Sequence, residues 1–123
     1  MLYHYKKDFE KIAMGLMSYA SDLNQTDRLM EEMDLYRQDS DRKLFLWKSE
    51  ETSDFVAILG VEIEQKVLLL RLIALSPSYR NEGLSYKMLD ALQAMYQDLP
   101  IMGTLETTPI IQTWQQDQSS AEE

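Results

Sequence analysis

The chain has 123 residues and a net charge of −9, and 45% of its residues are hydrophobic. This length and composition predict one domain with a hydrophobic core. The absence of cysteine excludes a disulfide framework, a thiolate zinc site and a covalent cysteine mechanism, and it fits a reducing compartment. No apolar run approaches the roughly 18 residues of a membrane span and no signal-peptide pattern follows Met1, so we expect a cytoplasmic protein that binds no membrane.

The negative charge restricts the partners of the protein. Such a surface repels nucleic acid, so an anionic small molecule must be held by a focused site. His4 is the only histidine, and we expect it to be an ordinary side chain of the first strand and predict no metal site. The acidic run at residues 39–41 lacks the ligands of a calcium loop and is interpreted as a solvated turn. Glu31, Glu32 and Asp34, on the polar face of a predicted helix, are also interpreted as solvated.

The first part of the chain is predicted to be mainly helical. Residues 2–5 form a short strand, and apolar residues at helical spacing follow over residues 9–20, with Asp8 as the N-cap. A second helix begins after a polar turn, with Asn24 or Thr26 as its N-cap.

The middle of the chain is predicted to form a sheet. Residues 43–48 alternate between two apolar faces, and a hairpin connects them to a strand at residues 55–63. Gly60 inside that strand indicates a bulge or a close backbone approach. Residues 67–75 are apolar on both faces, which predicts a central strand covered on both sides.

The last part of the chain returns to helix and strand. Residues 84–96 have helical spacing, and residues 101–105 form a strand that a right-handed crossover places parallel to the 67–75 strand. Residues 107–116 form a final helix, and we expect residues 117–123 to be a disordered acidic tail.

The junction between the central strand and the long helix has a chemical use. Pro77 ends the strand and Gly83 lies at the start of the helix. The free N–H groups of a helix start bind phosphate, a glycine lets the backbone approach the anion, and Arg80 adds a cation. A strand-turn-helix corner also needs such a glycine for purely structural reasons, so this feature alone leaves both interpretations open.

The sequence around the junction resembles a known signature. The run from Leu75 to Leu89 is similar to the acetyl-CoA motif of the GCN5-related N-acetyltransferases, Arg/Gln-x-x-Gly-x-Gly/Ala, in which Arg80 and Gly83 match and Ser85 departs. Serine is small enough to keep the backbone near a pyrophosphate. The apolar-x-Pro-x-Tyr segment before the motif also matches, with Leu75, Pro77 and Tyr79. Residues 5–16 and 41–48 resemble, less specifically, the short RibT-type proteins encoded with riboflavin-synthesis genes in some Gram-positive bacteria.

The resemblance implies a fold, a cofactor and a site. The fold is of the α/β (α+β) class, with a mixed, mostly antiparallel central sheet, flanking helices and a shortened C-terminus. The cofactor is acetyl-CoA, the acceptor is an amine, and a homodimer is compatible with the family. The residues implied to bind CoA are Ile73, Ala74, Leu75, Arg80, Asn81, Glu82, Gly83, Leu84, Ser85, Tyr86 and Trp114.

The resemblance also implies a bulge in the central strand, which splays it from the last strand and lets the backbone of Ile73 and Leu75 pair with the pantetheine arm. Glu62 and Glu64 are candidates for the general base by position only. Arg71 either reaches an acidic substrate or pairs with a neighbouring carboxylate, and we favour the pairing.

Two departures from the family give rise to other hypotheses. The family often carries Asn-x-x-Ala-x-x-x-Tyr in the last helix, where this chain has Thr107 and Trp114, and it usually continues into a further strand pair. An indole N–H cannot reprotonate a thiolate, so Trp114 is interpreted as a packing residue or a wall of the thiol pocket. The leading hypothesis is a CoA-dependent N-acetyltransferase that acts on a small-molecule or protein amine, with a link to riboflavin biosynthesis implied by the closer resemblance. The alternatives are a CoA-binding regulatory module without activity and a purely structural interaction domain.

Overall fold

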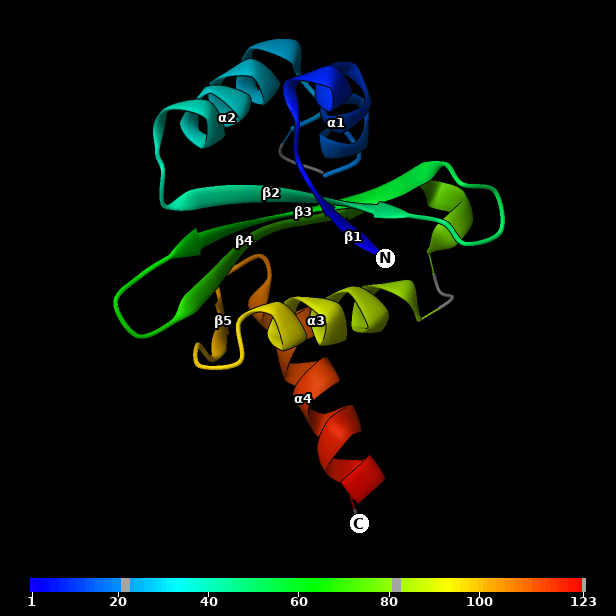
Figure 1. Ribbon diagram of the computed structural model, residues 1–123, viewed down its shortest axis with the longest axis vertical. Coiled ribbons are helices and arrows are strands. Elements are labelled where there is room, and N and C mark those ends of the chain that lie inside the picture. The colour runs from blue at the N-terminus through cyan, green and yellow to red at the C-terminus, as the bar shows by residue number, and fades with distance from the viewer. Residues whose placement is uncertain (21–22, 81–82, 123) are drawn as a thin grey trace.

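The computed structural model describes residues 1–20, 23–80 and 83–122, with side chains as far as Asp117. Its centre is a five-stranded sheet in the order β1-β2-β3-β4-β5 (Figure 1). Every neighbouring pair is antiparallel except β4 and β5, which are parallel. The strands are β1 (Leu2–His4), β2 (Arg42–Lys48), β3 (Phe55–Ile63), β4 (Leu68–Leu75) and β5 (Ile101–Gly103).

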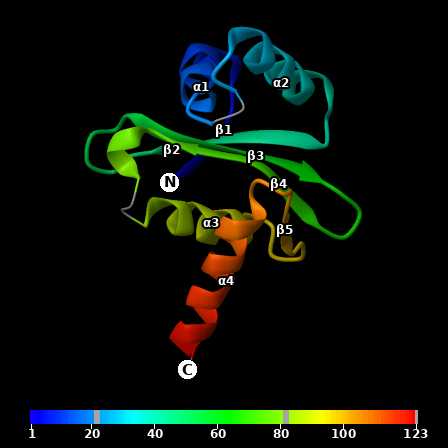
Figure 2. The same ribbon diagram turned by 180° about the vertical axis from the view of Figure 1, so that it is seen from behind.

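The helices cover both faces of the sheet. α1 and α2 lie on one face, and α3 and α4 lie on the other, as the two opposite views show (Figure 1, Figure 2). Short 3-10 turns precede α1, at Lys7–Phe9, and follow β4, at Pro77–Tyr79. The helices are α1 (Glu10–Met17), α2 (Thr26–Gln38), α3 (Leu84–Met95) and α4 (Thr108–Glu122).

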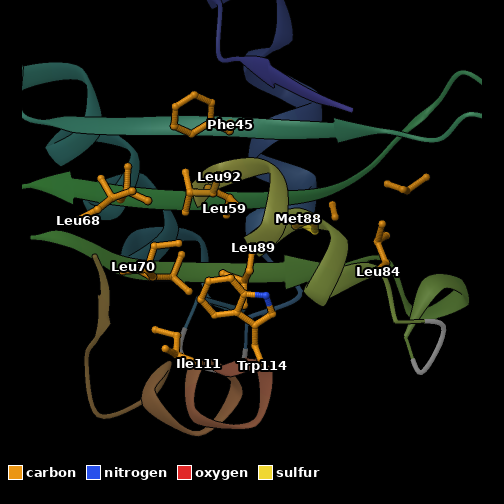
Figure 3. Close-up of a cluster of buried hydrophobic side chains, with 14 residues drawn as sticks. Phe45, Leu59, Leu68, Leu70, Leu84, Met88, Leu89, Leu92, Ile111 and Trp114 are labelled. Atoms are coloured by element: carbon orange, nitrogen blue, oxygen red, sulfur yellow. The ribbon is translucent and has the colours of Figure 1, made fainter. Parts of the chain in front are cut away.

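Each face of the sheet has its own buried cluster, because side chains of a strand point alternately to opposite faces. In β2, Leu44 and Leu46 pack with the cluster under α1 and α2. Phe45 lies between them in sequence and belongs to the cluster under α3 and α4 (Figure 3). The predicted alternation of this strand is therefore confirmed.

The predicted architecture is confirmed as a whole. The sheet is mixed and mostly antiparallel, the helices flank it, and the last strand is parallel to the central one. In the described part of the chain, no helix is both long and apolar enough to cross a bilayer.

The predicted helix caps are wrong. Asp8 lies inside the 3-10 turn, and the N-cap of α1 is Phe9. Neither Asn24 nor Thr26 is the N-cap of α2, which is Gln25, and neither Phe9 nor Gln25 makes a capping hydrogen bond with its side chain. At α1 the 3-10 turn replaces a side-chain cap, because the backbone N–H of Phe9 already donates to the carbonyl of Lys6 at 2.9 Å.

Two boundaries near the C-terminus also differ from the prediction. β5 ends at Gly103 rather than 105, because the chain turns at Thr104, whose carbonyl accepts the N–H of Thr108 at 2.9 Å. Leu105, expected in the strand, is 93% exposed. α4 extends to Glu122, beyond the predicted end at residue 116. The single domain over residues 1–116 and the disorder of the acidic tail in solution stay predictions.

Candidate functional site

The two parallel strands pair over only part of their length. The register joins residues 68–70 of β4 to residues 101–103 of β5, and it ends there. Beyond Leu70, β4 continues to Leu75 beside β3 alone, so its other edge faces a gap. A cavity of about 600 Å³ lies along this gap. Its wall includes Arg71, Leu72, Ile73, Ala74, Leu75, Arg80, Thr104, Glu106 and Thr107.

Thr107 connects the end of the last strand pair to the start of α4. Its side chain is buried, and its hydroxyl donates to the carbonyl of Leu70 at 2.7 Å. The same oxygen accepts the backbone N–H of Thr104 at 2.9 Å. This hydroxyl bonds to β4 at the last paired residue, where the chain after β5 turns away. The sequence predicted Thr107 only as the beginning of a helix, and its contact with β4 was missed.

A bulge in β4 determines which backbone groups face the gap. Val61 of β3 pairs with Leu70 and Gly60 pairs with Leu72, so Arg71 is an extra residue on β4. Before the bulge, the N–H of Leu68 points to the β5 side, where it donates to the carbonyl of Pro100 at 2.9 Å. The predicted bulge in this strand is confirmed.

After the bulge the alternation is inverted. Ser76 donates its N–H to the carbonyl of Val56 on the β3 side at 2.8 Å. Because backbone groups alternate along a strand, Ala74 also faces β3, whereas Ile73 and Leu75 face the gap. Without the extra residue, the backbone N–H and C=O groups of Ile73 and Leu75 would form their hydrogen bonds with β3. The structure thus presents to the cavity the two backbone positions that the sequence resemblance implied.

The start of α3 offers further donors. Gly83 is the N-cap of α3 and has a φ of +74°, a left-handed conformation that favours glycine. Gly83 has no side chain to make a capping hydrogen bond, and the N–H of Lys87 donates to the carbonyl of Gly83, so among the described residues the N–H groups of residues 84–86 have no helix partner. No atom of the described residues lies within 4 Å of the position that a Cβ of Gly83 would take. Leu84 is buried and Ser85 and Tyr86 are half-buried. The surface at this helix end therefore consists largely of backbone groups.

Arg80 is exposed at the same corner, lines the cavity, and lies with its guanidinium 6.0 Å from the ring centre of Tyr19. Asn81 and Glu82, predicted to contribute to the same turn, lie outside the described residues.

The predicted bases occupy different places. Glu62 accepts a hydrogen bond from the guanidinium of Arg71 at 3.0 Å, and a guanidinium nitrogen of Arg42 lies 3.9 Å away. Arg71 therefore pairs with a carboxylate, the interpretation we favoured, while it also lines the cavity. Glu64 is exposed in the turn between β3 and β4 and lines a different hollow, which it shares with Asp41.

Trp114 does not line the cavity. Its side chain is 3% exposed within the cluster under α3 and α4 (Figure 3), and its indole N–H donates to Asp90 of α3 at 2.9 Å. These contacts agree with a packing residue. The described residues contain no group of three or more side chains suited to hold a metal ion.

The cavity includes residues that sequence reasoning did not place there. Tyr19, Ala20 and Leu23 come from the segment between α1 and α2, and Arg28 and Glu32 come from α2. The only signal for Glu32 was its place on the polar face of a helix, which is also the pattern of a solvated residue. Its approach to β4 depends on how α2 lies over the sheet.

Comparison with known proteins identifies the family. No model of a known protein family matches the sequence. An uncharacterized N-acetyltransferase of the lysA 3′ region of Bacillus methanolicus is 36% identical over 113 residues, which cover 91% of this chain and 92% of the relative. The chain belongs to the GCN5-related N-acetyltransferase family. The enzyme class predicted from the Gly83 motif is therefore confirmed.

Solved structures of other acetyltransferases share the fold. AAC(6′)-Iy, bound to the bisubstrate analogue CoA-S-monomethyl-acetylneamine, has a TM-score of 0.72 at 15% identity. The superposition covers 95% of this chain and 87% of the AAC(6′)-Iy chain. The aminoglycoside 6′-N-acetyltransferase AAC(6′)-Ih of Acinetobacter baumannii has a TM-score of 0.67 at 16% identity, with 94% and 86% covered. At such identities the likeness is one of fold.

Proposed function

We propose that this N-acetyltransferase binds acetyl-CoA in the gap between β4 and β5 and transfers the acetyl group to an amine. The observation that carries the proposal is the end of strand pairing at Leu70, which leaves the backbone of Ile73 and Leu75 facing a cavity. An extended pantetheine arm has amide groups that can pair with such an edge, as an added strand would. AAC(6′)-Iy, which shares the fold, has been crystallised with CoA.

The start of α3 is the proposed site of the pyrophosphate. Free N–H groups at a helix start attract anions, and the left-handed Gly83 keeps this approach clear of a side chain. Arg80 contributes the cation next to it. In a protein of net charge −9, this local arrangement supplies the focused positive potential that a CoA anion requires.

The reaction would rest mainly on positioning. The amine nitrogen forms a bond to the thioester carbon, the carbon–sulfur bond breaks, the thiolate of CoA leaves, and the proton of the amine passes to solvent or a base. Backbone N–H groups at the bulge supply donors for the thioester oxygen. We expect slow turnover, because Trp114 brings no acidic proton to the thiol and Glu62 is paired with Arg71. General acid catalysis contributes roughly 10²–10⁴-fold where it operates.

The second candidate is a CoA-binding regulatory module without transfer activity. The buried position of Trp114, where the family often has a tyrosine, favours it. Calorimetric titration with CoA tests binding, and release of free thiol from acetyl-CoA in the presence of a panel of amines tests transfer. Thiol release that depends on the amine supports the enzyme. Binding without release supports the module, and no binding refutes both.

We also propose a closer placement of the protein within the acetyltransferase family. The segments at residues 5–16 and 41–48 support a place among the RibT-type proteins and a link to riboflavin biosynthesis. We further propose a cytoplasmic location and a homodimer, the latter to be checked by light scattering on the purified protein. Loss of riboflavin output upon deletion of the gene in its natural host, restored by the intact gene, is the result expected for the riboflavin link.

A further inference from the structure

Arginines are concentrated in the cavity beside β4. The chain has five arginines, Arg28, Arg37, Arg42, Arg71 and Arg80, and three of them, Arg28, Arg71 and Arg80, line this one cavity. None of the described residues that line this cavity is a lysine. This selection is notable in a chain whose net charge is −9, since carboxylates outnumber cations over the rest of its surface.

The three arginines lie in different parts of the cavity wall. Arg80 follows the turn after β4 and belongs to the corner where we place the pyrophosphate. Arg71 is the extra residue of the bulge, and its partner Glu62 also approaches Arg42, which in turn lies 3.9 Å from Glu32 of α2. This chain of charges places the Arg71 side chain on the α1/α2 face of the sheet.

Arg28 comes from the first turn of α2, on the same face. Its side chain makes no ion pair with any described residue, and it is exposed. Two guanidinium groups therefore line the part of the cavity that α2 covers, away from the α3 corner. A guanidinium binds a carboxylate or a phosphate with paired hydrogen bonds.

Carboxylates line the cavity as well. Glu32, one turn after Arg28 on α2, and Glu106, after β5, are both part of its wall. The side chain of Glu32 is 24% exposed, so it faces the cavity without full hydration. A carboxylate in this position attracts an ammonium group, and two nearby guanidinium groups attract an anion. The charges of the cavity wall therefore complement a molecule that has both an ammonium group and an anionic group.

We propose that the acceptor is an amine that also carries an anionic group, a carboxylate or a phosphate, which Arg28 and Arg71 bind while Glu32 attracts the amine. This inference rests on the proposed function. It separates the protein from acetyltransferases whose acceptors are polycations, because a polycation would meet the guanidinium group of Arg28, which has no ion pair among the described residues, together with those of Arg71 and Arg80 in the same cavity.

The test compares matched acceptors in the acetyl-transfer assay at saturating acetyl-CoA. The first pair is an α-amino acid and its carboxamide, and the second is phosphoethanolamine and ethanolamine; an aminoglycoside represents the polycations. We expect kcat/KM at least tenfold higher for the anionic member of one pair. The better pair shows whether the anion is a carboxylate or a phosphate.

Variants assign the preference to residues. Arg28→Gln and Arg71→Gln should each reduce the preference by about 10- to 100-fold, chiefly through KM, because each removes a charge-assisted hydrogen-bond donor. Arg37→Gln is the matched control, since Arg37 lies on the same helix and pairs with Asp34 and Glu10 outside the cavity. Arg28 is exposed, so its replacement keeps the test valid if Arg71→Gln fails to fold.

CoA affinity separates this inference from the proposal on which it rests. The affinity of the Arg28 and Arg71 variants for CoA should stay within about twofold of the parent. Transfer that is equal or faster with the neutral amines or the aminoglycoside overturns the inference alone. So does a large loss of CoA affinity in Arg28→Gln, because that arginine would then serve the cofactor. Absence of CoA binding, or of transfer to any amine, refutes the proposed enzyme and this inference with it.

Discussion

Substitution of Gly83 tests whether the start of α3 holds the pyrophosphate. Two costs follow from any side chain there. The left-handed φ of +74° makes most residues unfavourable, by about 1–2 kcal/mol, whether or not CoA is bound. A charge at this position acts only on a bound anion. Gly83→Asp alone would mix the two, and a lowered melting temperature would follow even if Gly83 served the fold only.

The pair Gly83→Asp and Gly83→Asn separates these costs. Both side chains have the same shape and both tolerate the left-handed region, so the two variants should unfold at similar temperatures. A carboxylate about 6 Å from a phosphate charge costs roughly 0.7–2.8 kcal/mol for effective dielectric constants between about 80 and 20. The Asp variant should therefore bind CoA about 3- to 100-fold more weakly than the Asn variant.

Calorimetric titration with CoA at low and high salt measures this ratio. We expect the ratio to shrink as salt rises, because the open space around Gly83 exposes the charge to screening. Arg80→Gln should show the same salt dependence, since Arg80 is exposed at this corner. Equal CoA affinities of the Asp and Asn variants at low salt would refute the placement of the pyrophosphate and leave Gly83 a structural role only.

Three further predictions concern the rest of the site. Trp114→Phe should lower the free energy of unfolding by about 1–3 kcal/mol, through the lost hydrogen bond to Asp90, while calorimetry finds CoA affinity within about twofold of the parent; a tenfold loss of affinity would show that Trp114 serves the cofactor. Gly60→Ala should destabilise by about 1–3 kcal/mol in denaturant unfolding, because its Cβ would lie 2.2 Å from the hydroxyl oxygen of Tyr36, and most of this cost should disappear in a Tyr36→Leu background. Burial, with a smaller contribution from Glu32, raises the pKa of Tyr36 above its ordinary value of 10.0, so unfolding curves should show full stability below pH 10 and a loss as the pH rises further. Tyr36→Phe should reduce that loss, and an unchanged pH profile would contradict the assignment.

The fold was largely predictable because local patterns determine it. β2 alternates apolar residues on both faces since each face has its own buried cluster, and Leu44 and Phe45 therefore reach different clusters. The strand-turn-helix junction at Gly83 was predictable for a similar reason. Its left-handed backbone conformation favours glycine, and this requirement depends only on the few residues of the turn itself. The helix caps were not, since Asp8 favours a cap but the chain enters α1 through a 3-10 turn.

The acceptor side of the site was beyond local patterns. Arg28 and Glu32 lie on the exposed face of an amphipathic helix, where charged residues are expected whether or not they line a cavity. They become part of the site through the position of α2 on its face of the sheet, and no local pattern encodes that position. Arg71 was the exception, because a charge inside an apolar strand demands a partner, which the structure shows to be Glu62.

Gly60 connects the packing of α2 to the opening of the site. Its sequence position indicated a bulge or a close approach, and the structure has both: the extra residue lies opposite it on β4, and the Tyr36 ring occupies the space above it. The hydroxyl of Tyr36 is buried without a hydrogen-bond partner among the described residues, a cost that close packing against Gly60 must offset. The same bulge turns the backbone of Ile73 toward the gap. Gly60, which lets α2 approach the sheet, therefore lies beside the point at which the backbone of β4 changes the side to which it donates hydrogen bonds. A sheet without this irregularity would direct the backbone of both Ile73 and Leu75 to β3, and the gap beside β5 would lose the two backbone positions on which the proposed cofactor site depends.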